Sequence, residues 1–222
     1  MATHAPRIPV LLATALVLSG CGAPDRAQDP FRQTGELIAL SGGDGGADNA
    51  CFTCHGRDGR GDGQAVPRLA GLSSGYMLRQ LDDYASGRRP DDVMTPIAKR
   101  LSETDRRKVS NYYAGLAIPP TRARTAVDTT GAVLYAAGDS ERGVLACARC
   151  HGPDGAGDAA NPPLAGQPAA YIARQMDRFA RGERRNDPRG VMWEISRRLT
   201  PSETAAVSAY AAGLGASSPP AR

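Results

Sequence analysis

The 222-residue chain contains few large apolar side chains. Leucine, isoleucine, valine and phenylalanine together number 36, which is 16% of the sequence, and seven of them lie in the first 20 residues. This composition borders on that of disordered proteins, but the formal net charge of +4 is too small for that class. A folded domain of this sequence therefore needs a large apolar body in its core besides its own side chains.

Lysine, histidine and long hydrophobic runs are also scarce. Of the 27 basic residues only Lys99 and Lys108 are lysines, and the small positive charge gives no support for nucleic-acid binding. The N-terminal apolar run, Val10–Leu18, has nine residues, whereas a helix that spans a bilayer needs about 20. We therefore expect no transmembrane helix and a chain that is soluble beyond its N-terminal segment.

The N-terminus predicts export and a lipid anchor. Residues 1–20 are typical of a secretory signal, with Arg7 before the apolar run and small residues after it. Residues 18–21, Leu-Ser-Gly-Cys, resemble a bacterial lipobox, in which the cysteine is lipidated and becomes the new N-terminus. Ordinary cleavage nearby would instead leave Cys21 as a free thiol in an oxidising compartment, so we expect lipidation. Residues 21–30 would then tether a periplasmic protein to a bacterial membrane, and the sequence leaves open which membrane.

Two Cys-x-x-Cys-His pentads stand out in the remaining sequence. In such a pentad both thiols can add across the vinyl groups of a haem, while the histidine faces the iron. The pentads hold four of the five cysteines and two of the three histidines, namely Cys51, Cys54 and His55, and Cys147, Cys150 and His151.

Two other interpretations of the pentads use less of the sequence. A zinc site made of the four cysteines would leave the two histidines unexplained. A redox-active Cys-x-x-Cys requires a strand followed by a helix, whereas a Gly-x-Asp-Gly-x-Gly-Asp loop follows each pentad here. The sequence therefore predicts two covalently bound haem c groups, each with one histidine as an axial ligand of the iron.

The pentads are embedded in a tandem duplication. The offset between matching residues is 96 around the first cysteines, 95 after the haem loops and 98 towards the end of each half. A repeat of this length indicates two like domains rather than a solenoid. We place the domains at residues 31–118 and 129–214, joined by a Pro-containing linker at 119–128 and followed by a tail at 215–222.

Each half predicts three helices and no strand, so the expected fold is all-α. The middle helix of each half ends at a glycine, and the last helix begins with a capping box. Loops that hold a haem and a methionine connect the helices. The expected helices cover roughly 31–41, 73–87 and 102 onward in the first half, and 129–137, 168–182 and 200 onward in the second.

Methionine is the expected ligand on the opposite side of each iron, because the mature chain has no spare histidine and a thioether suits low-spin iron. The repeat separates the four methionines beyond the signal. Met77 and Met176 align with apolar residues other than methionine, so we expect them in the core. Met94 and Met192 align with each other, in loops about 40 residues after the histidines, and we assign them as axial ligands.

Other repeated residues leave two roles open. Four of them either hydrogen-bond the haem propionates or form ordinary packing and solvated surface: Tyr76, Arg79, Tyr171 and Arg174. Pro67 and Pro163, just before each Leu-Ala-Gly, either support the histidine side of the haem or belong to a plain loop.

Together these motifs resemble the di-haem cytochrome c4 family of tandem class I cytochrome c domains. The shared elements are Cys-x-x-Cys-His-Gly-x-Asp-Gly-x-Gly, Pro-x-Leu-Ala-Gly, Tyr-x-x-x-Gln, the Met loop and a closing Tyr-x-Ala-Gly-Leu, over residues 31–214. The resemblance implies two cytochrome c folds related by a pseudo-twofold axis, with propionates near their interface. It also implies a periplasmic role, carrying electrons from a quinol-oxidising complex towards a terminal oxidase. The lipobox departs from many relatives, which look freely soluble.

We expect electron transfer without bond chemistry, because an iron with six ligands exchanges electrons but cannot bind oxygen or peroxide. A di-haem peroxidase, the enzymatic alternative, needs an open position on one iron, and matched methionines in both halves argue against it. A dedicated haem subunit of a membrane-associated dehydrogenase or oxidase complex is a further alternative, hardly separable from a mobile carrier by sequence. The expected partners are respiratory redox proteins, with no small-molecule substrate, and the propionates bring the mature protein close to neutral.

Overall fold

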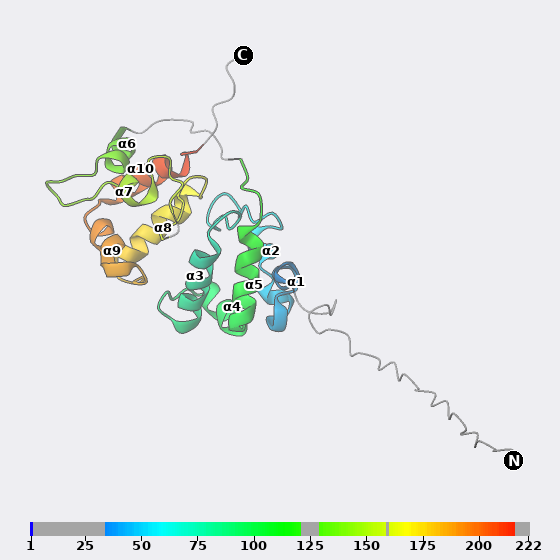
Figure 1. Ribbon diagram of the computed structural model, residues 1–222. Helices are drawn as coiled ribbons and strands as arrows, with labels where there is room; N and C mark the ends of the chain where they lie inside the picture. Colours follow the sequence, from blue (N-terminus) through cyan, green and yellow to red (C-terminus); the bar gives the residue numbers. More distant parts are fainter. Residues whose placement is uncertain (2–33, 121–128, 159, 216–222) are drawn as a thin grey trace. The chain divides into compact units, whose positions relative to one another are not determined.

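The computed structural model describes residues 34–120, 129–158 and 160–215, together with Met1 (Figure 1). The predicted signal, Cys21 and tether therefore lie outside the described residues, as does most of the predicted linker and tail. The described chain is helical, and its only β-type pairing is an isolated bridge between Asp139 and Val144. Within these ranges no helix combines the length and the apolar character that a membrane crossing requires.

The described residues of the first half form five α-helices around an apolar core. Helix α1 packs against α5, and α3 packs against both α4 and α5. The core between them is formed by buried side chains that include Ile38, Met77, Leu101, Val109 and Tyr113. The helices are α1 (Gly35–Ser41), α2 (Phe52–His55), α3 (Ser74–Ser86), α4 (Met94–Arg100) and α5 (Glu103–Ala114), with short 3-10 turns at Gly43–Gly45 and Ala47–Asn49.

The second half repeats this arrangement. Helix α10 packs against α6 and α8, and α8 packs against α9. Its core includes Leu134, Tyr135, Ile172, Met176 and Val207. The helices are α6 (Thr129–Ala136), α7 (Ala148–His151), α8 (Ala169–Ala180), α9 (Val191–Ser196) and α10 (Pro201–Ala212), with a 3-10 turn, η4, at Pro188–Gly190.

Capping residues explain where the long helices begin and end. The Ser73 side chain accepts from the amide of Tyr76 at the start of α3, and Gly87 ends that helix at φ 80°, a conformation that glycine adopts freely. Thr200 and Glu203 form a complete reciprocal capping box at the start of α10, with Pro201 in the first turn. Ser102 caps α5 in the same position. The predicted starts of these helices are confirmed.

The methionine segments differ from the prediction. Met94 and Met192 were expected in loops, but Met94 begins α4 and Met192 is the second residue of α9. Helix α4 starts there because Asp91 accepts hydrogen bonds from the amides of Val93 and Met94, at 3.1 and 2.9 Å. The aspartate stands three residues before Met94, so it is the signal that the loop prediction overlooked.

Two glycines allow the first and last helices of each half to cross closely. A Cβ atom at Gly35 would collide with the backbone carbonyl of Lys108 in α5. A Cβ atom at Gly131 would collide in the same way with the carbonyl of Ala206 in α10. Glycine is therefore required at both positions by backbone contact rather than by backbone conformation.

Candidate functional site

A large cavity of about 1410 Å³ lies among the helices. Pockets for single small molecules usually hold about 300–1,000 Å³, so this volume suits more than one ligand or one very large group. The cavity brings together every residue that the sequence predicted at a haem within the described residues. These are Cys51, Cys54, His55 and Met94, with Tyr76 and Arg79, and Cys147, Cys150, His151 and Met192, with Tyr171 and Arg174.

Both pentad histidines are buried and held by one hydrogen bond each. Nδ1 of His55 lies 3.0 Å from the carbonyl oxygen of Pro67, and Nδ1 of His151 lies 2.8 Å from that of Pro162. A carbonyl oxygen can only accept, so Nδ1 carries the proton and Nε2 keeps a free lone pair. Burial lowers the pKa of both imidazoles, which keeps them neutral at pH 7. Neutral imidazole with an oriented Nε2 is the form that binds iron.

Of the two prolines for which the sequence left the role open, only Pro67 accepts from a pentad histidine. Pro67 does support the histidine side, but its counterpart is Pro162 rather than Pro163. The offset of 95 residues that holds after the haem loops leads from Pro67 to Pro162, and so does the spacing Pro-x-Leu-Ala-Gly. Pro163 corresponds to Arg68 in the first half.

The four pentad cysteines are free, without disulfide bonds. Cys54 and Cys150 are exposed, whereas burial raises the pKa of Cys51 and of Cys147 to about 11. Each pair spans one turn of a short helix, which places the two sulfurs three residues apart on one face. In the described parts of the chain no group of three or more His, Cys, Asp or Glu could hold a metal ion, so the zinc alternative gains no support.

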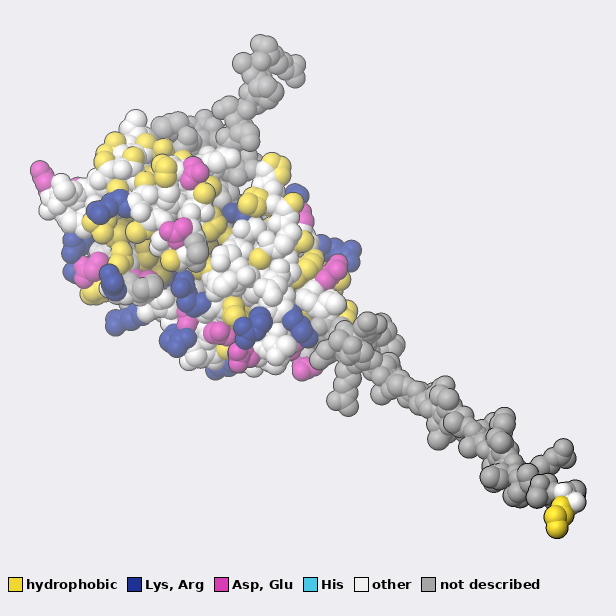
Figure 2. All heavy atoms as spheres, in the orientation of Figure 1, with side chains coloured by type: hydrophobic (Ala, Val, Ile, Leu, Met, Phe, Trp, Pro, Cys, Tyr) yellow, Lys and Arg dark blue, Asp and Glu magenta, His cyan; other side chains and the backbone are white. Residues whose placement is uncertain are grey.

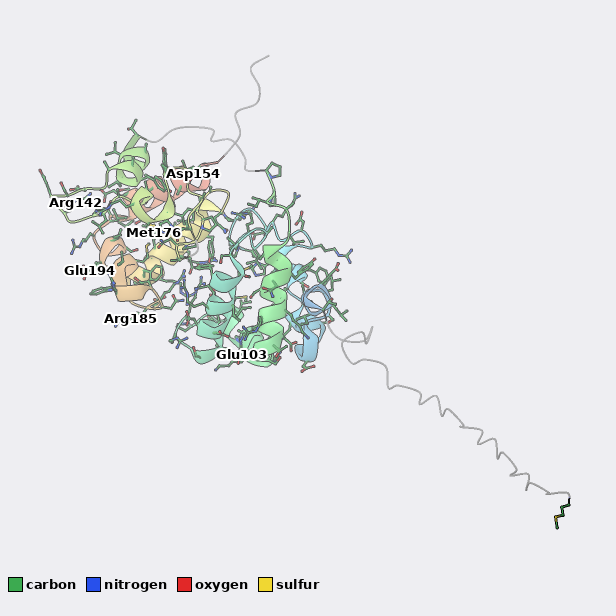
Figure 3. All side chains as sticks on the ribbon, viewed as in Figure 1. Glu103, Arg142, Asp154, Met176, Arg185 and Glu194 are labelled. Atoms are coloured by element: carbon green, nitrogen blue, oxygen red, sulfur yellow. The ribbon has the colours of Figure 1, made fainter. Side chains whose placement is uncertain are left out.

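The four methionines fall into two structural classes. Met77 and Met176 are buried, each in the apolar core of its own half. Figure 3 labels Met176 in the second half. The sulfur of Met176 also accepts a hydrogen bond from Oγ of Ser208 at 3.8 Å. Met94 and Met192 are half-buried at the start of their helices, although all four methionines line the cavity. The structure therefore distinguishes the methionines along the same division as the repeat.

The four candidate propionate residues lie at the contact between the halves. Arg79 donates to the carbonyl of Ala160 at 3.3 Å, and Arg174 donates to the carbonyl of Ala65 at 2.7 Å. Each guanidinium also lies over the tyrosine that precedes it, Tyr76 or Tyr171, at 5.6 and 5.9 Å from the ring centroid. These arginines thus reach from one half to the haem loop of the other.

Two further arginines at this contact were missed by the sequence analysis. Arg89 and Arg184 are buried, with 3% and 7% of their surface exposed. Arg89 donates to Oε1 of Gln80 at 2.9 Å and to Oε1 of Gln175 at 2.8 Å. Arg184 donates to the same two oxygens, at 3.2 and 2.8 Å respectively. These four side chains, Arg89, Gln80, Arg184 and Gln175, form a closed ring that we call the Arg–Gln ring.

The Arg–Gln ring carries positive charge, and within the described residues no carboxylate accepts a hydrogen bond from either arginine. Burial, and then repulsion from Arg89, lower the pKa of Arg184. Nε of Arg89 is buried and has no hydrogen-bond partner within the described residues. A buried guanidinium is stabilised when a carboxylate neutralises it, and both arginines line the cavity. Haem propionates supply carboxylates of this kind, so these residues fit the cofactor that the pentads predict.

Comparison with known proteins decides the family. The cytochrome c family model matches residues 43–116 and 129–214, one match in each half. Cytochrome c4 from Pseudomonas aeruginosa is 34% identical over 184 residues, which cover 80% of this chain and 92% of that protein. The chain belongs to the di-haem cytochrome c4 family. As a cytochrome c4 it is an electron carrier that binds two haem c groups through its pentads, and its partners are redox proteins.

Other relatives of this cytochrome c4 carry a more specific name. The thiosulfate dehydrogenase electron acceptor of Stutzerimonas stutzeri is 40% identical over 186 residues, covering 82% of this chain and 86% of that protein. The solved thiosulfate dehydrogenase of Marichromatium purpuratum matches 85% of this chain with a TM-score of 0.71 and 37% identity, and this chain spans 43% of its length. Reduced cytochrome c4 from Pseudomonas stutzeri matches 74% of this chain with a TM-score of 0.68 and 34% identity, and 93% of that chain is covered. The predicted all-α, two-domain fold is confirmed.

Proposed function

We propose that this cytochrome c4 accepts electrons from a thiosulfate-oxidising dehydrogenase and passes them to a respiratory oxidase. The observation that carries the proposal is the order of similarity among relatives. Two thiosulfate dehydrogenase electron acceptors are 40% identical to this chain, whereas four proteins named cytochrome c4 are 33–38% identical. A quinol-oxidising complex is the second candidate donor, which the likeness to the cytochrome c4 proteins themselves favours.

The axial ligands of both irons are part of this proposal. We assign His55 and Met94 to the first iron, and His151 and Met192 to the second. The half-buried positions of Met94 and Met192, against the buried positions of Met77 and Met176, support the assignment, as does the engaged sulfur of Met176. Haem c would supply a reversible one-electron change, and these four side chains would hold the two irons, so that little reorganisation would accompany the electron.

The location is proposed from the sequence. Cys21 would carry the lipid that holds the protein at a membrane on the periplasmic side, and the described domains would remain in the aqueous phase. On the face drawn in Figure 2, basic and acidic side chains are intermingled, with no patch of a single sign. Cys21→Ser should release the protein from the membrane fraction, and a variant that stays bound to membranes would contradict the lipid anchor.

The donor can be tested by stopped-flow mixing. Oxidised holo-protein is mixed with purified thiosulfate dehydrogenase and thiosulfate, and the reduced c-type absorption band is followed. We expect reduction that requires both enzyme and thiosulfate and that is faster than for cytochrome c4 of Pseudomonas aeruginosa under the same conditions. Reduction by a quinol-oxidising complex with its quinol, but not by the dehydrogenase, would replace the first candidate donor with the second.

A further inference from the structure

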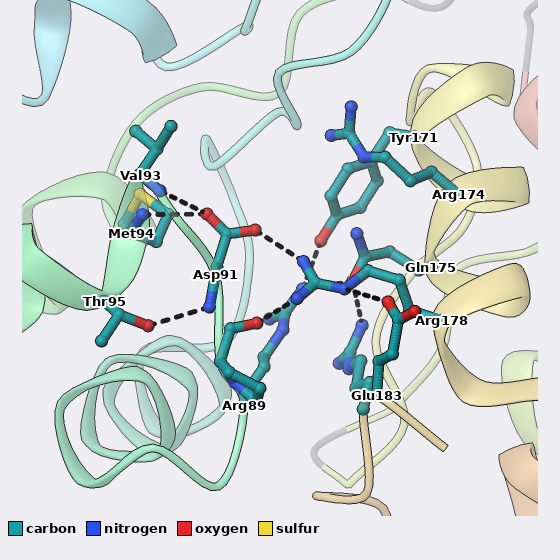
Figure 4. A network of polar contacts seen from close by, with 12 residues as sticks. Arg89, Asp91, Val93, Met94, Thr95, Tyr171, Arg174, Gln175, Arg178 and Glu183 are labelled. Carbon is teal, nitrogen blue, oxygen red and sulfur yellow. Dashed lines mark hydrogen bonds and ion pairs between the residues drawn. The ribbon is translucent and has the colours of Figure 1, made fainter. Parts of the chain in front are cut away.

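The carboxylate of Asp91 joins the Met94 segment of the first domain to a helix of the second. Its Oδ1 accepts from the amide of Met94 at 2.9 Å, and its Oδ2 accepts from Nη1 of Arg178 in α8 at 2.7 Å (Figure 4). The backbone amide of Asp91 in turn donates to Oγ1 of Thr95 at 2.9 Å. Both carboxylate oxygens are therefore engaged, one by each domain.

The ion pair between Arg178 and Asp91 is largely shielded from solvent. Only 16% of the Arg178 side chain and 25% of the Asp91 side chain are exposed. Arg178 also donates to the carbonyl of Pro90, so its guanidinium binds two consecutive residues of the first domain. Burial tends to raise the pKa of Asp91, but the hydrogen bonds from Met94 and Arg178 outweigh it and lower that pKa overall. A shielded, charge-assisted contact of this kind is stronger than an exposed ion pair.

Within the described residues, the aspartate that accepts from the Met192 amide makes no bond to the first domain. Oδ2 of Asp187 accepts from the amide of Met192 at 2.6 Å, but Oδ1 of Asp187 is buried and has no partner among the residues that the structure describes. The turn before Met192 also contains Arg189 at φ 62°, a left-handed conformation that a residue with a side chain adopts at a cost. The two methionine segments are thus held with different strength.

The repeat shows why the ion pair between Arg178 and Asp91 has no counterpart at the Met192 segment. At the offset of 95 residues, Arg178 corresponds to Asp83 and Asp91 corresponds to Asn186. The equivalent contact does form, because Nδ2 of Asn186 donates to Oδ2 of Asp83 at 2.7 Å. It joins an amide to a carboxylate, however, and it does not include the residue that accepts from the Met192 amide, which is Asp187.

We propose that Arg178 of the second domain is a positioning residue for Met94 of the first, acting through Asp91. The second domain then helps to position Met94 directly, whereas Asp187, which accepts from the Met192 amide, makes no bond to the first domain within the described residues. This inference rests on the proposed axial roles of Met94 and Met192. Loss of the contact between Arg178 and Asp91 would weaken the binding of Met94 more than that of Met192.

Imidazole competition in two backgrounds tests this inference. The weak near-infrared charge-transfer band of the oxidised protein reports methionine bound to ferric iron. With Met192→His only Met94 contributes to the band, and with Met94→His only Met192 contributes. In the first background we expect Arg178→Gln to lower the imidazole concentration that removes half of the band by about 5- to 10-fold. In the second background we expect a change of less than about 2-fold.

Two further variants control for charge and folding. Arg181→Gln removes the same charge from the C-terminal end of α8, where Arg181 pairs with Asp177 and Glu183. In both backgrounds it should leave unchanged the imidazole concentration that removes half of the band. Asp91→Asn keeps an acceptor for the Met94 amide but loses the ion pair, so it should reproduce the effect of Arg178→Gln and add little to it. Equal shifts in both backgrounds, or none in either, would overturn the inference. A band that survives Met94→His and Met192→His together would instead overturn the axial assignment.

Discussion

Arg89 of the first domain donates a hydrogen bond to Oε1 of Gln175 in the second domain, at 2.8 Å. Because Arg184 donates to the same oxygen, a single amide group joins the two buried guanidinium groups. The Arg–Gln ring therefore places two positive charges at the contact between the domains, on the wall of the cavity that contains both pentads. Positive charge at this place favours the reduced, less positive form of each haem.

Arg89→Gln should accordingly lower the reduction potentials of the protein. We expect a fall of about 30–60 mV for the more affected haem, which corresponds to about 3- to 10-fold in a one-electron equilibrium. Spectroelectrochemical titration measures both potentials. Arg88→Gln is the matched control, because Arg88 has 67% of its side chain exposed and pairs with Asp83. Equal effects of the two variants would contradict a specific role for the Arg–Gln ring.

Replacement of single methionines tests the axial assignment directly. Met94→Ala or Met192→Ala should each abolish about half of the near-infrared charge-transfer band, because each removes one thioether ligand. Met77→Leu and Met176→Leu should leave the band intact, since both residues are buried in the apolar cores and leucine has a similar volume. Loss of intensity in either leucine variant would show that the buried methionines, not the half-buried pair, bind iron.

Alanine at Gly35 should destabilise the first domain, although alanine usually stabilises a helix. The added Cβ meets the Lys108 carbonyl of α5, and overpacking of this kind costs about 1–3 kcal/mol of unfolding free energy. Gly75 in α3 provides the control, because a Cβ there would meet only Oγ of Ser73, at 3.9 Å. Gly75→Ala should stabilise by up to about 1 kcal/mol. Urea unfolding followed by circular dichroism measures both, and shifts of the same sign would count against the close helix crossing.

Acid should weaken the second domain through Glu203. Its hydrogen bonds with Arg142 and with the Thr200 amide lower the pKa of this carboxyl from 4.5 to about 2. The carboxylate therefore stabilises the fold fully above about pH 4.5, and this stabilisation disappears as the pH falls from 4.5 towards 2. Glu203→Gln should lower the melting temperature at pH 7 and flatten its decline between pH 5 and pH 2. Glu103→Gln in α5, whose carboxylate pairs with exposed Arg107, should leave the acid decline unchanged.

Local chemistry made much of the fold predictable. Helix α3 begins after Ser73 and ends before Gly87 as expected, and the capping box of Thr200 and Glu203 starts α10. Capping acts over three or four residues, so it can be recognised in a short stretch of sequence. The start of α4 was not predicted, because the residue that accepts from its first amides is Asp91 and not a serine or threonine of a capping box. Helix α8 ends at Ala180, two residues before the predicted glycine, and Gly182 follows it at φ 69°.

Contacts between the domains were harder to predict from the sequence. The repeat pairs Arg89 with Arg184, and it pairs Gln80 with Gln175, so their shared importance was visible in the sequence. Their burial was not, because an arginine is ordinarily a solvated residue. Only the packing of two domains brings each arginine to the glutamine of the other. The ion pair between Asp91 and Arg178 depends on the same packing.

The buried thiols of Cys51 and Cys147 constrain the order in which this protein is made. A cysteine reacts as its thiolate, and a pKa of about 11 leaves almost none at neutral pH once the chain has closed around the sulfur. Thioether formation is therefore faster on an open chain, where the same thiol is exposed to water. The burial of these two sulfurs therefore favours haem attachment before the chain closes around them.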